Sequence, residues 1–370
     1  MTFALTEEHA ELRASVRRFL TDRSPVSAAR RYMTEPGAYD EALWTQMADQ
    51  LGLPGLAVAE EYGGSGYGTA ELAIVLEELG SMLYVGPYFA TVALAGQTLA
   101  ASEDAQAKAH WLPGIADGTT TAALAVGEGG RTWVTDFATR ATAAGDGWTL
   151  DGTKRFVIDG ATAGLLLVFA ATDDGVGLFA LDRTTDGVQP TALDTLDLTR
   201  RLADVTFTSA SATRIGGEAS ELLAHASDLA VVALAAEQVG GTQHCLDETV
   251  EYAKLRVQFG RKIGSFQAVK HRAADVLLAL ETARSAMAHA AAVVDAGGDE
   301  AALSAALAAS LCSEAFTEAA RANIQLHGGI GFTWEHDAHL YLKRAKSDEL
   351  LFGAPVYHRM RLGALTGITG

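Results

Sequence analysis

The stretch that begins at Arg256 combines residues suited to holding a diphosphate next to an aromatic ring. It reads Arg-Val-Gln-Phe-Gly, with Phe259 three residues after the arginine, and it lies between two predicted long helices. A guanidinium is a planar fork of donors that matches phosphate oxygens, and a phenyl ring offers a flat face to an adenine. The structural alternative is a basic helix end that complements the helix dipole, with a phenylalanine in the core. The residues alone leave both interpretations open.

A glycine-rich turn at residues 325–331 is the second candidate for binding a phosphate. Its sequence is Gln-Leu-His-Gly-Gly-Ile-Gly, and Gly328 and Gly329 directly follow a predicted helix. Glycine adopts backbone angles that are closed to other residues and lets a phosphate-bearing ligand approach the main chain. The alternative is an ordinary glycine cap that ends the helix. We expect His327 to pack or to form a hydrogen bond rather than to act as a catalyst.

The histidine spacing does not predict a metal site. The acidic and imidazole side chains with helix-like spacing are Glu335, His336, Asp337 and His339. This segment lacks a third set of ligands, so a closed coordination shell is not expected. The two cysteines, Cys245 and Cys312, stand far apart in helical patterns and are expected to be buried, reduced thiols.

The elements that must position these motifs fall into three blocks. Amphipathic helices are predicted first, with Thr6 as a helix cap. Short β-rich runs with intervening turns follow, and Asp151-Gly152 is expected to be the turn of a hairpin. Alanine-rich helices joined by short loops come last, which is typical of an antiparallel four-helix bundle. The expected helices are 40–51, 69–79, 226–256, 265–296, 299–326 and 338–351, and the expected strands are 148–150, 155–158, 165–170, 176–181 and 202–208. The expected domains are therefore 1–117, 118–217 and 218–370.

Composition limits the partners of the chain. It has 370 residues, a net charge of −18 and a pI near 4.9. This acidity argues against nucleic acid or an anionic membrane surface as a partner. No apolar run reaches the about 18 residues of a membrane helix, and residues 1–8 show no signal peptide. A cytoplasmic protein with no membrane segment is therefore expected.

The two motifs and the order of the three blocks resemble the acyl-CoA dehydrogenase family, whose members use FAD to oxidise acyl-CoA thioesters to 2,3-enoyl-CoA. The resemblance covers nearly the whole chain. It implies an α+β multidomain fold: an N-terminal helical domain, a middle antiparallel β domain and a C-terminal four-helix bundle. It also implies that both motifs contact an FAD held mainly by a neighbouring subunit. The residues carried over are Arg256, Phe259, Gln267, Gln325, Gly328 and Gly329.

Other positions depart from the family pattern. Where the family places hydroxyl side chains beside the flavin, this chain has Gly127 and Ile158. The catalytic base of the family is a glutamate at one of two places, which correspond here to Ala230 and Phe352. Removing a proton next to a thioester carbonyl needs a base such as a carboxylate. The carboxylates considered as replacements are Asp228 and Glu349.

Three roles are compatible with a chain that keeps the two FAD motifs but lacks the hydroxyl side chains beside the flavin and the catalytic base. The segment Trp334-Glu335-His336 resembles a branch of the family that includes members acting on steroid side-chain CoA thioesters. That branch contains pairs of unlike subunits, one of which lacks the base. The first expected role is such a companion subunit, in an α2β2 assembly with a homologous catalytic chain. The second is a homomeric acyl-CoA dehydrogenase with a relocated carboxylate, and the third is a non-catalytic assembly protein.

Overall fold

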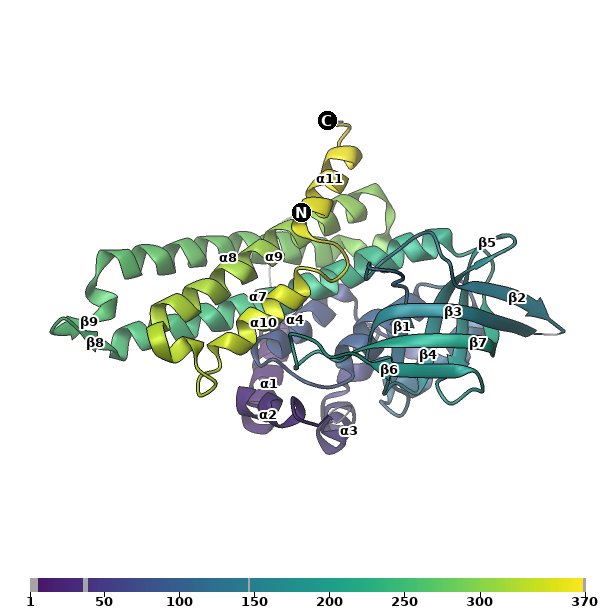
Figure 1. The fold of residues 1–370 in the computed structure, drawn as a ribbon, viewed down its shortest axis with the longest axis horizontal. Coiled ribbons are helices and arrows are strands. Elements are labelled where there is room, and N and C mark those ends of the chain that lie inside the picture. Colours follow the sequence, from purple (N-terminus) through teal and green to yellow (C-terminus); the bar gives the residue numbers. More distant parts are fainter. Residues whose placement is uncertain (1–5, 36–38, 146, 369–370) are drawn as a thin grey trace. The chain divides into compact units, whose positions relative to one another are not determined.

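The chain divides into two compact units in the computed structural model, which describes residues 6–35, 39–145 and 147–368 (Figure 1). Residues 1–5, part of the segment in which no signal peptide was expected, lie outside the described residues. The expected domains 1–117, 118–217 and 218–370 stay a prediction, because contacts group the chain in another way. The first unit comprises Met1–Arg30, Ala73–Tyr84 and Val231–Gly370, and the second comprises Arg31–Leu72 and Val85–Ala230.

The first unit is built on a bundle of long helices. Its elements are α1 (Glu7–Arg23), most of α4 (Thr69–Ser81), most of α7 (Ser220–Leu255), β8 (Val257–Gln258), β9 (Arg261–Lys262), η4 (Ile263–Ser265), α8 (Gln267–Val293), η5 (Val294–Ala296), α9 (Gly298–His327), η6 (Gly328–Phe332), α10 (Ala338–Asp348) and α11 (Pro355–Leu365). The helices predicted from residue 226 onward are confirmed, and α7 begins earlier than expected. The hydroxyl of Thr6 caps α1, as expected, by accepting from the His9 N–H at 3.2 Å.

Two glycines allow α4 to cross α7 with direct backbone contact. A Cβ on Gly240 of α7 would lie 1.8 Å from the carbonyl oxygen of Glu77, and one on Gly80 of α4 would lie 2.2 Å from that of Glu237. No side chain fits at either position without a shift of the main chain. The crossing therefore depends on glycine in both helices.

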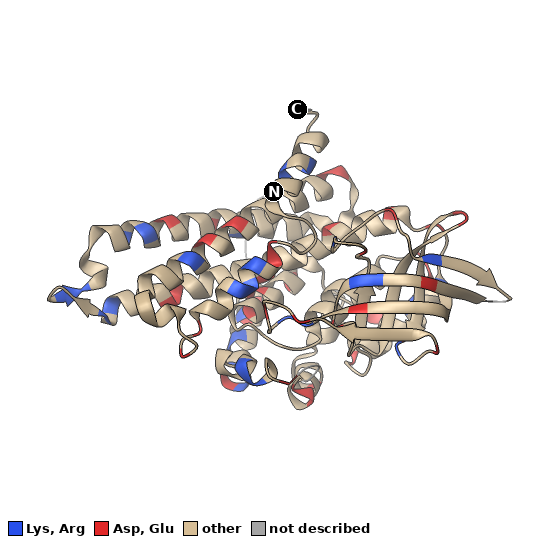
Figure 2. Cartoon of the chain, viewed as in Figure 1, with Lys and Arg blue, Asp and Glu red and all other residues tan. Residues whose placement is uncertain are grey.

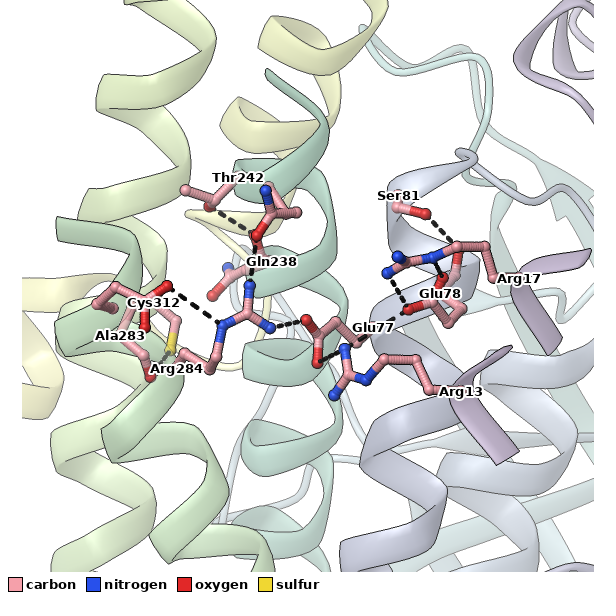
Figure 3. Close-up of polar contacts among 12 residues, drawn as sticks. Arg13, Arg17, Glu77, Glu78, Ser81, Gln238, Thr242, Ala283, Arg284 and Cys312 are labelled. Atoms are coloured by element: carbon pink, nitrogen blue, oxygen red, sulfur yellow. Dashed lines mark hydrogen bonds and ion pairs between the residues drawn. The ribbon is translucent and has the colours of Figure 1, made fainter. Parts of the chain in front are cut away.

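A buried ion-pair network fastens α1 and α4 to the bundle (Figure 3). Glu77 is only 3% exposed, and its carboxylate meets Arg13 of α1 at 2.8 Å and Arg284 of α8. The neighbouring carboxylate of Glu78 accepts two hydrogen bonds from Arg17, at 2.8 and 2.7 Å. Loss of a basic partner would weaken the compensation of a buried carboxylate, which is destabilising.

By length and composition alone, α7 and α8 are long and apolar enough to cross a membrane. In the most apolar stretch of 18 residues, 78% of α7 is buried inside the protein, and the buried share of the corresponding stretch that begins in α8 is 39%. Core helices of bundles meet the same criteria, so these two helices give only weak evidence of a membrane span.

The second unit holds a seven-stranded sheet whose pairings close into a circuit. The strands are β1 (Ala122–Ala125), β2 (Arg140–Ala144), β3 (Gly147–Ile158), β4 (Leu165–Thr172), β5 (Gly175–Asp182), β6 (Val188–Ala192) and β7 (Leu202–Ile215). Its helices are α3 (Glu41–Leu51), η1 (Leu53–Gly55), η2 (Glu60–Tyr62), η3 (Phe89–Gly96), α5 (Gln97–Ala100) and α6 (Ala105–Ala116), and α2 (Val26–Tyr32) lies at the border of the two units. The circuit runs β4-β2-β3-β7-β5 and back to β4. All pairings are antiparallel except β1–β4 and a single-residue β2–β4 contact, which are parallel. The strands predicted at 165–170, 176–181 and 202–208 are confirmed.

The expected hairpin turn at Asp151-Gly152 is wrong. β3 continues through both residues, and its register with β7 shifts between Leu150 and Gly152, which marks a bulge. Gly152 has a φ of +141°, and a Cβ there would lie 2.7 Å from the Cα of Thr139. The glycine therefore serves a close approach inside a bulged strand, and the hairpin lies instead between β2 and β3.

Candidate functional site

The two candidates for phosphate binding lie at the same end of the bundle. Near the end of α7, the ring of Tyr252 packs on His327, the last residue of α9, with centroids 4.2 Å apart. One turn earlier, the Thr249 hydroxyl donates to Oδ1 of Asn323 at 3.1 Å. Because α7 and α9 end together, the β8–β9 hairpin and the glycine turn both start from this end (Figure 1).

Phe259 forms the tip of the hairpin together with Gly260. Both residues have positive φ, +53° and +73°, which is the pattern of a type I′ turn. A positive φ is unusual for an aromatic residue, and such strain is concentrated at functional sites. Phe259 is 92% exposed and makes an edge contact with Phe266 at 6.2 Å. The ring thus adds little to the stability of the chain and is available to a group from outside it.

Basic residues are grouped at the β8–β9 end of the bundle, where the ribbon is blue in Figure 2. Arg256, Arg261 and Lys262 are all exposed, and the guanidinium of Arg261 lies 4.0 Å from the centre of the Phe266 ring. Gln267 is exposed as the first residue of α8. On a chain with a net charge of −18, such a local basic group is what an anionic ligand requires.

The main chain of the glycine turn is open to an incoming group. Gly328 ends α9 with a φ of +63°, and its N–H donates to the carbonyl oxygen of Gln325. A Cβ on Gly328 or Gly329 would meet no heavy atom within 4 Å. The side chain of Gln325 is exposed, and so is that of Phe332 beyond the turn. All six residues carried over as cofactor contacts are therefore exposed.

The two positions assigned to the base are apolar and buried. Ala230 is 1% exposed and Phe352 is 6% exposed. Arg256 follows Ala230 by 26 residues through the single helix α7, so at a rise of 1.5 Å per residue about 39 Å separates the two. A cofactor contact at the hairpin therefore serves a different place from a reaction centre beside Ala230 of the same chain.

The two replacement carboxylates differ in their surroundings. Asp228 lies on α7 and is buried. Glu349 follows α10 and is held by the ammonium group of Lys346 and by the Thr317 hydroxyl, which donates at 3.3 Å. Both contacts are made to the same oxygen of Glu349, Oε2.

Gly127, where the resemblance expects a hydroxyl beside the flavin, has no room for a side chain. A Cβ there would lie 2.5 Å from the carbonyl oxygen of Arg155 and 2.8 Å from that of Arg131. The N–H of Arg155 also donates to the Gly127 carbonyl at 2.8 Å. Ile158, at the second such position, is buried at the end of β3. The backbone around residue 127 is thus built for glycine and would have to move to admit a threonine.

A buried ion pair next to Gly127 was missed by sequence reasoning. Lys154 Nζ donates to Oε1 of Glu128 at 2.6 Å and lies 3.9 Å from the centre of the Phe137 ring. Burial lowers the pKa of Lys154 to about 8, although the Glu128 carboxylate acts against this shift. Glu128 also accepts from the Ala138 N–H at 2.6 Å, so it links the segment before β2 to Lys154 of β3. The partners stand 26 residues apart, and no local pattern links them.

The cysteines take no part in the site. Cys245 and Cys312 are free, buried thiols, as expected. Burial raises the pKa of both thiols well above the ordinary value, which keeps them protonated and unreactive.

Comparisons with known proteins cover nearly the whole chain. Descriptions of the acyl-CoA dehydrogenase N-terminal domain and C-terminal domain match residues 6–119 and 228–365. The acyl-CoA dehydrogenase IpdE2 of Mycobacterium tuberculosis is 38% identical over 353 residues, which cover 94% of each chain. A chain in the crystal structure of the ChsE4-ChsE5 complex from Mycobacterium tuberculosis is 30% identical with a TM-score of 0.91, and the match covers 100% of this chain and 100% of that chain. A structure of the Tcur3481-Tcur3483 steroid ACAD is 32% identical with a TM-score of 0.90, covering 98% of this chain and 99% of the other.

Proposed function

The chain belongs to the acyl-CoA dehydrogenase family, a family of FAD-dependent oxidoreductases, and from this premise we propose that it is the base-lacking member of a pair of unlike subunits. FAD supplies the hydride acceptor of the reaction when it is bound. In the proposed role, this chain completes the FAD site of a homologous catalytic subunit. The catalytic subunit supplies the carboxylate that removes the substrate proton.

The proposal rests on one contrast: the residues of the cofactor motifs are exposed, whereas the two base positions hold buried, apolar residues. Arg256, Phe259 and the glycine turn are exposed at one end of the bundle, where they can reach a ligand of another chain. Ala230 and Phe352 are buried and offer no proton acceptor. The about 39 Å between Ala230 and Arg256 supports cofactor contacts made across a subunit interface.

We further propose that the assembly is an α2β2 complex in the cytoplasm that acts on acyl-CoA thioesters with a steroid-derived acyl group. The name "steroid ACAD" of a structure at 32% identity supports this substrate class. A second similar structure is a complex of two named chains, which supports a partner of the same fold.

The test is to purify the chain alone and together with its catalytic homologue, and to measure flavin content and turnover in each. We expect the chain alone to hold far less than one FAD per chain and to show no turnover, and the complex to hold FAD and to be active. Stoichiometric FAD with turnover by the lone chain would overturn the proposal. In that case, loss of activity in Glu349→Gln or Asp228→Asn would identify a relocated base. A complex without FAD would indicate an assembly protein.

Within the complex, Arg256→Ala tests the contact itself. We expect it to lower FAD retention, most strongly at high salt, because an exposed guanidinium acts on phosphate largely through its charge. Arg140→Ala in the sheet unit is the matched control, since Arg140 is also exposed and pairs with Asp173 at 2.8 Å. Equal FAD retention in both variants would contradict the assigned contact.

A further inference from the structure

A second cluster of chemically active side chains lies just inside the end of the bundle. Glu248 of α7, His327 of α9 and His336 of the loop before α10 each offer one ligand atom, and these atoms all lie within 4.8 Å of one another. In the sequence, the residue grouped with His336 by helix-like spacing was His339, and no third set of ligands could be found nearby. In the folded chain, His339 turns to the ring of Trp334 at 4.7 Å, whereas His336 faces His327 with ring centroids 4.4 Å apart.

Hydrogen bonds from one residue orient two of these ligands. The carbonyl oxygen of Asn323 accepts from Nδ1–H of His327 at 2.8 Å, which leaves the lone pair of Nε2 free. The side-chain amide of Asn323 donates to Oε2 of Glu248 at 2.7 Å and leaves Oε1 for a further partner. Such outer bonds from ligands to neighbouring groups are typical of built metal sites.

The loop that carries His336 is held in place by Arg30. Its guanidinium donates to the carbonyl oxygens of Trp334 and His336, each at 2.8 Å, and pairs with Asp337 at 2.7 Å. Nε2 of His336 lies 3.9 Å from Oε1 of Glu248, which is too long for a direct hydrogen bond. The gap between the two side chains is of the size that a bridging ion would fill.

We propose that Glu248, His327 and His336 bind a divalent transition ion of the zinc type. Two imidazole nitrogens and one carboxylate oxygen are a ligand set that zinc takes, with water in the fourth position. Bonds of about 2.1 Å in tetrahedral geometry bring ligand atoms to roughly 3.4 Å from one another, so modest rotations of the partly exposed Glu248 and His336 complete the set.

Binding requires a change of tautomer at His336. Its Nδ1 accepts from the Ala338 N–H at 3.1 Å in the structure, which places the proton of the neutral ring on Nε2. Coordination through Nε2 moves that proton to Nδ1 and gives up this hydrogen bond. We therefore expect an affinity below that of a closed structural zinc site, with saturation at one ion per chain.

The test uses the full-length, untagged chain after removal of bound metals with a chelator. Zn²⁺ is titrated by calorimetry, and Co²⁺ is used as a probe because its absorption spectrum reports tetrahedral coordination. We expect one ion per chain, a higher midpoint of thermal unfolding with Zn²⁺, and no effect of Mg²⁺, which prefers oxygen ligands. His336→Ala is the main variant, since its side chain is partly exposed, and Glu248→Gln, which keeps the shape of the side chain, is the second.

Each variant should weaken Zn²⁺ binding at least tenfold, whereas His339→Gln and the exposed His271→Gln should leave it unchanged. The proposal is overturned if the unmodified chain binds no Zn²⁺ at 0.1 mM (a concentration of order 10⁻⁴ M, well above the dissociation constants of zinc sites). It is equally overturned if His336→Ala and Glu248→Gln bind the ion as well as the unmodified chain does. Because the chain is assayed alone and without FAD, failure here is distinct from failure of the proposed subunit role.

Discussion

Replacing Phe259 by alanine should weaken FAD binding in the assembly without destabilising the chain. The ring is 92% exposed, so its removal costs almost no buried apolar surface in the isolated chain. Alanine keeps a Cβ at a φ of +53°, and the strain of the turn is therefore unchanged. We expect the free energy of unfolding to change by less than about 0.5 kcal/mol, as for other surface substitutions.

In the assembly, the same ring is proposed to be buried against the cofactor. Burying a phenylalanine side chain contributes about 1.5–3 kcal/mol. With about 1.4 kcal/mol for each factor of ten, this corresponds to a roughly 10- to 150-fold loss of FAD affinity. Thermal or chemical unfolding of the isolated chain measures the first quantity, and equilibrium dialysis of FAD against the complex measures the second.

A control variant is Tyr67→Ala, which removes an exposed aromatic side chain from the other unit and should change neither quantity. The reasoning is refuted if Phe259→Ala lowers the unfolding free energy by the about 3–5 kcal/mol typical of a core phenylalanine. It is also refuted if the complex retains FAD as well as before.

Three further predictions concern stability. Gly240→Ala should destabilise the chain by about 3 kcal/mol or more in denaturant unfolding, because its Cβ would lie 1.8 Å from a main-chain oxygen, whereas Gly217→Ala, which faces open space, should not. Glu77→Gln should cost about 2–4 kcal/mol by the same measurement, since it removes the buried carboxylate shared by two partly buried arginines, whose other carboxylate contacts, to Glu78 and Glu281, are longer at 3.5 and 3.8 Å. Glu281→Gln, whose carboxylate is exposed, should cost under about 1 kcal/mol. Finally, the pKa of Lys154 is lowered by burial to about 8 from 10.5, so the unfolded chain binds more protons between these values. The free energy of unfolding should then rise with pH from about 8 to 10.5 and gain nothing further from this group below or above that window, and Lys154→Met should flatten the rise.

Local sequence patterns predicted the long helices and the strands β3, β4, β5 and β7, but they missed α2, α6 and α11 and the strands β1, β2 and β6. The glycines at 328 and 329 ended α9 where the helix periodicity stopped, and two short β-rich runs, at 165–170 and 176–181, predicted β4 and β5. The prediction of a turn at Asp151-Gly152 was wrong because the same dipeptide can form a bulge inside a strand that continues through it. That length is decided by pairing with β7, some fifty residues later in the chain.

The candidate site was only partly accessible from the sequence. Each of the two cofactor motifs could be recognised by itself, but their common location follows from α7 and α9 ending together, which the contact of Tyr252 with His327 reveals. The pairing of Glu248 with His327 and His336 could not be seen, because 79 residues separate the first two positions. Local spacing instead suggested His339, whose side chain points to Trp334.

The ion pairs of Glu77 also set an order for folding during synthesis. Arg284 leaves the ribosome 207 residues after Glu77, whereas the sheet unit is complete once residue 230 has emerged. Because domains fold as their last segment becomes available, the sheet unit can form before the helical unit is fully synthesised. Until α8 follows, the nascent chain carries Glu77 without its second arginine. A ribosome that stops before α8 would therefore release a folded sheet unit whose N-terminal helices lack the ion pair between Glu77 and Arg284.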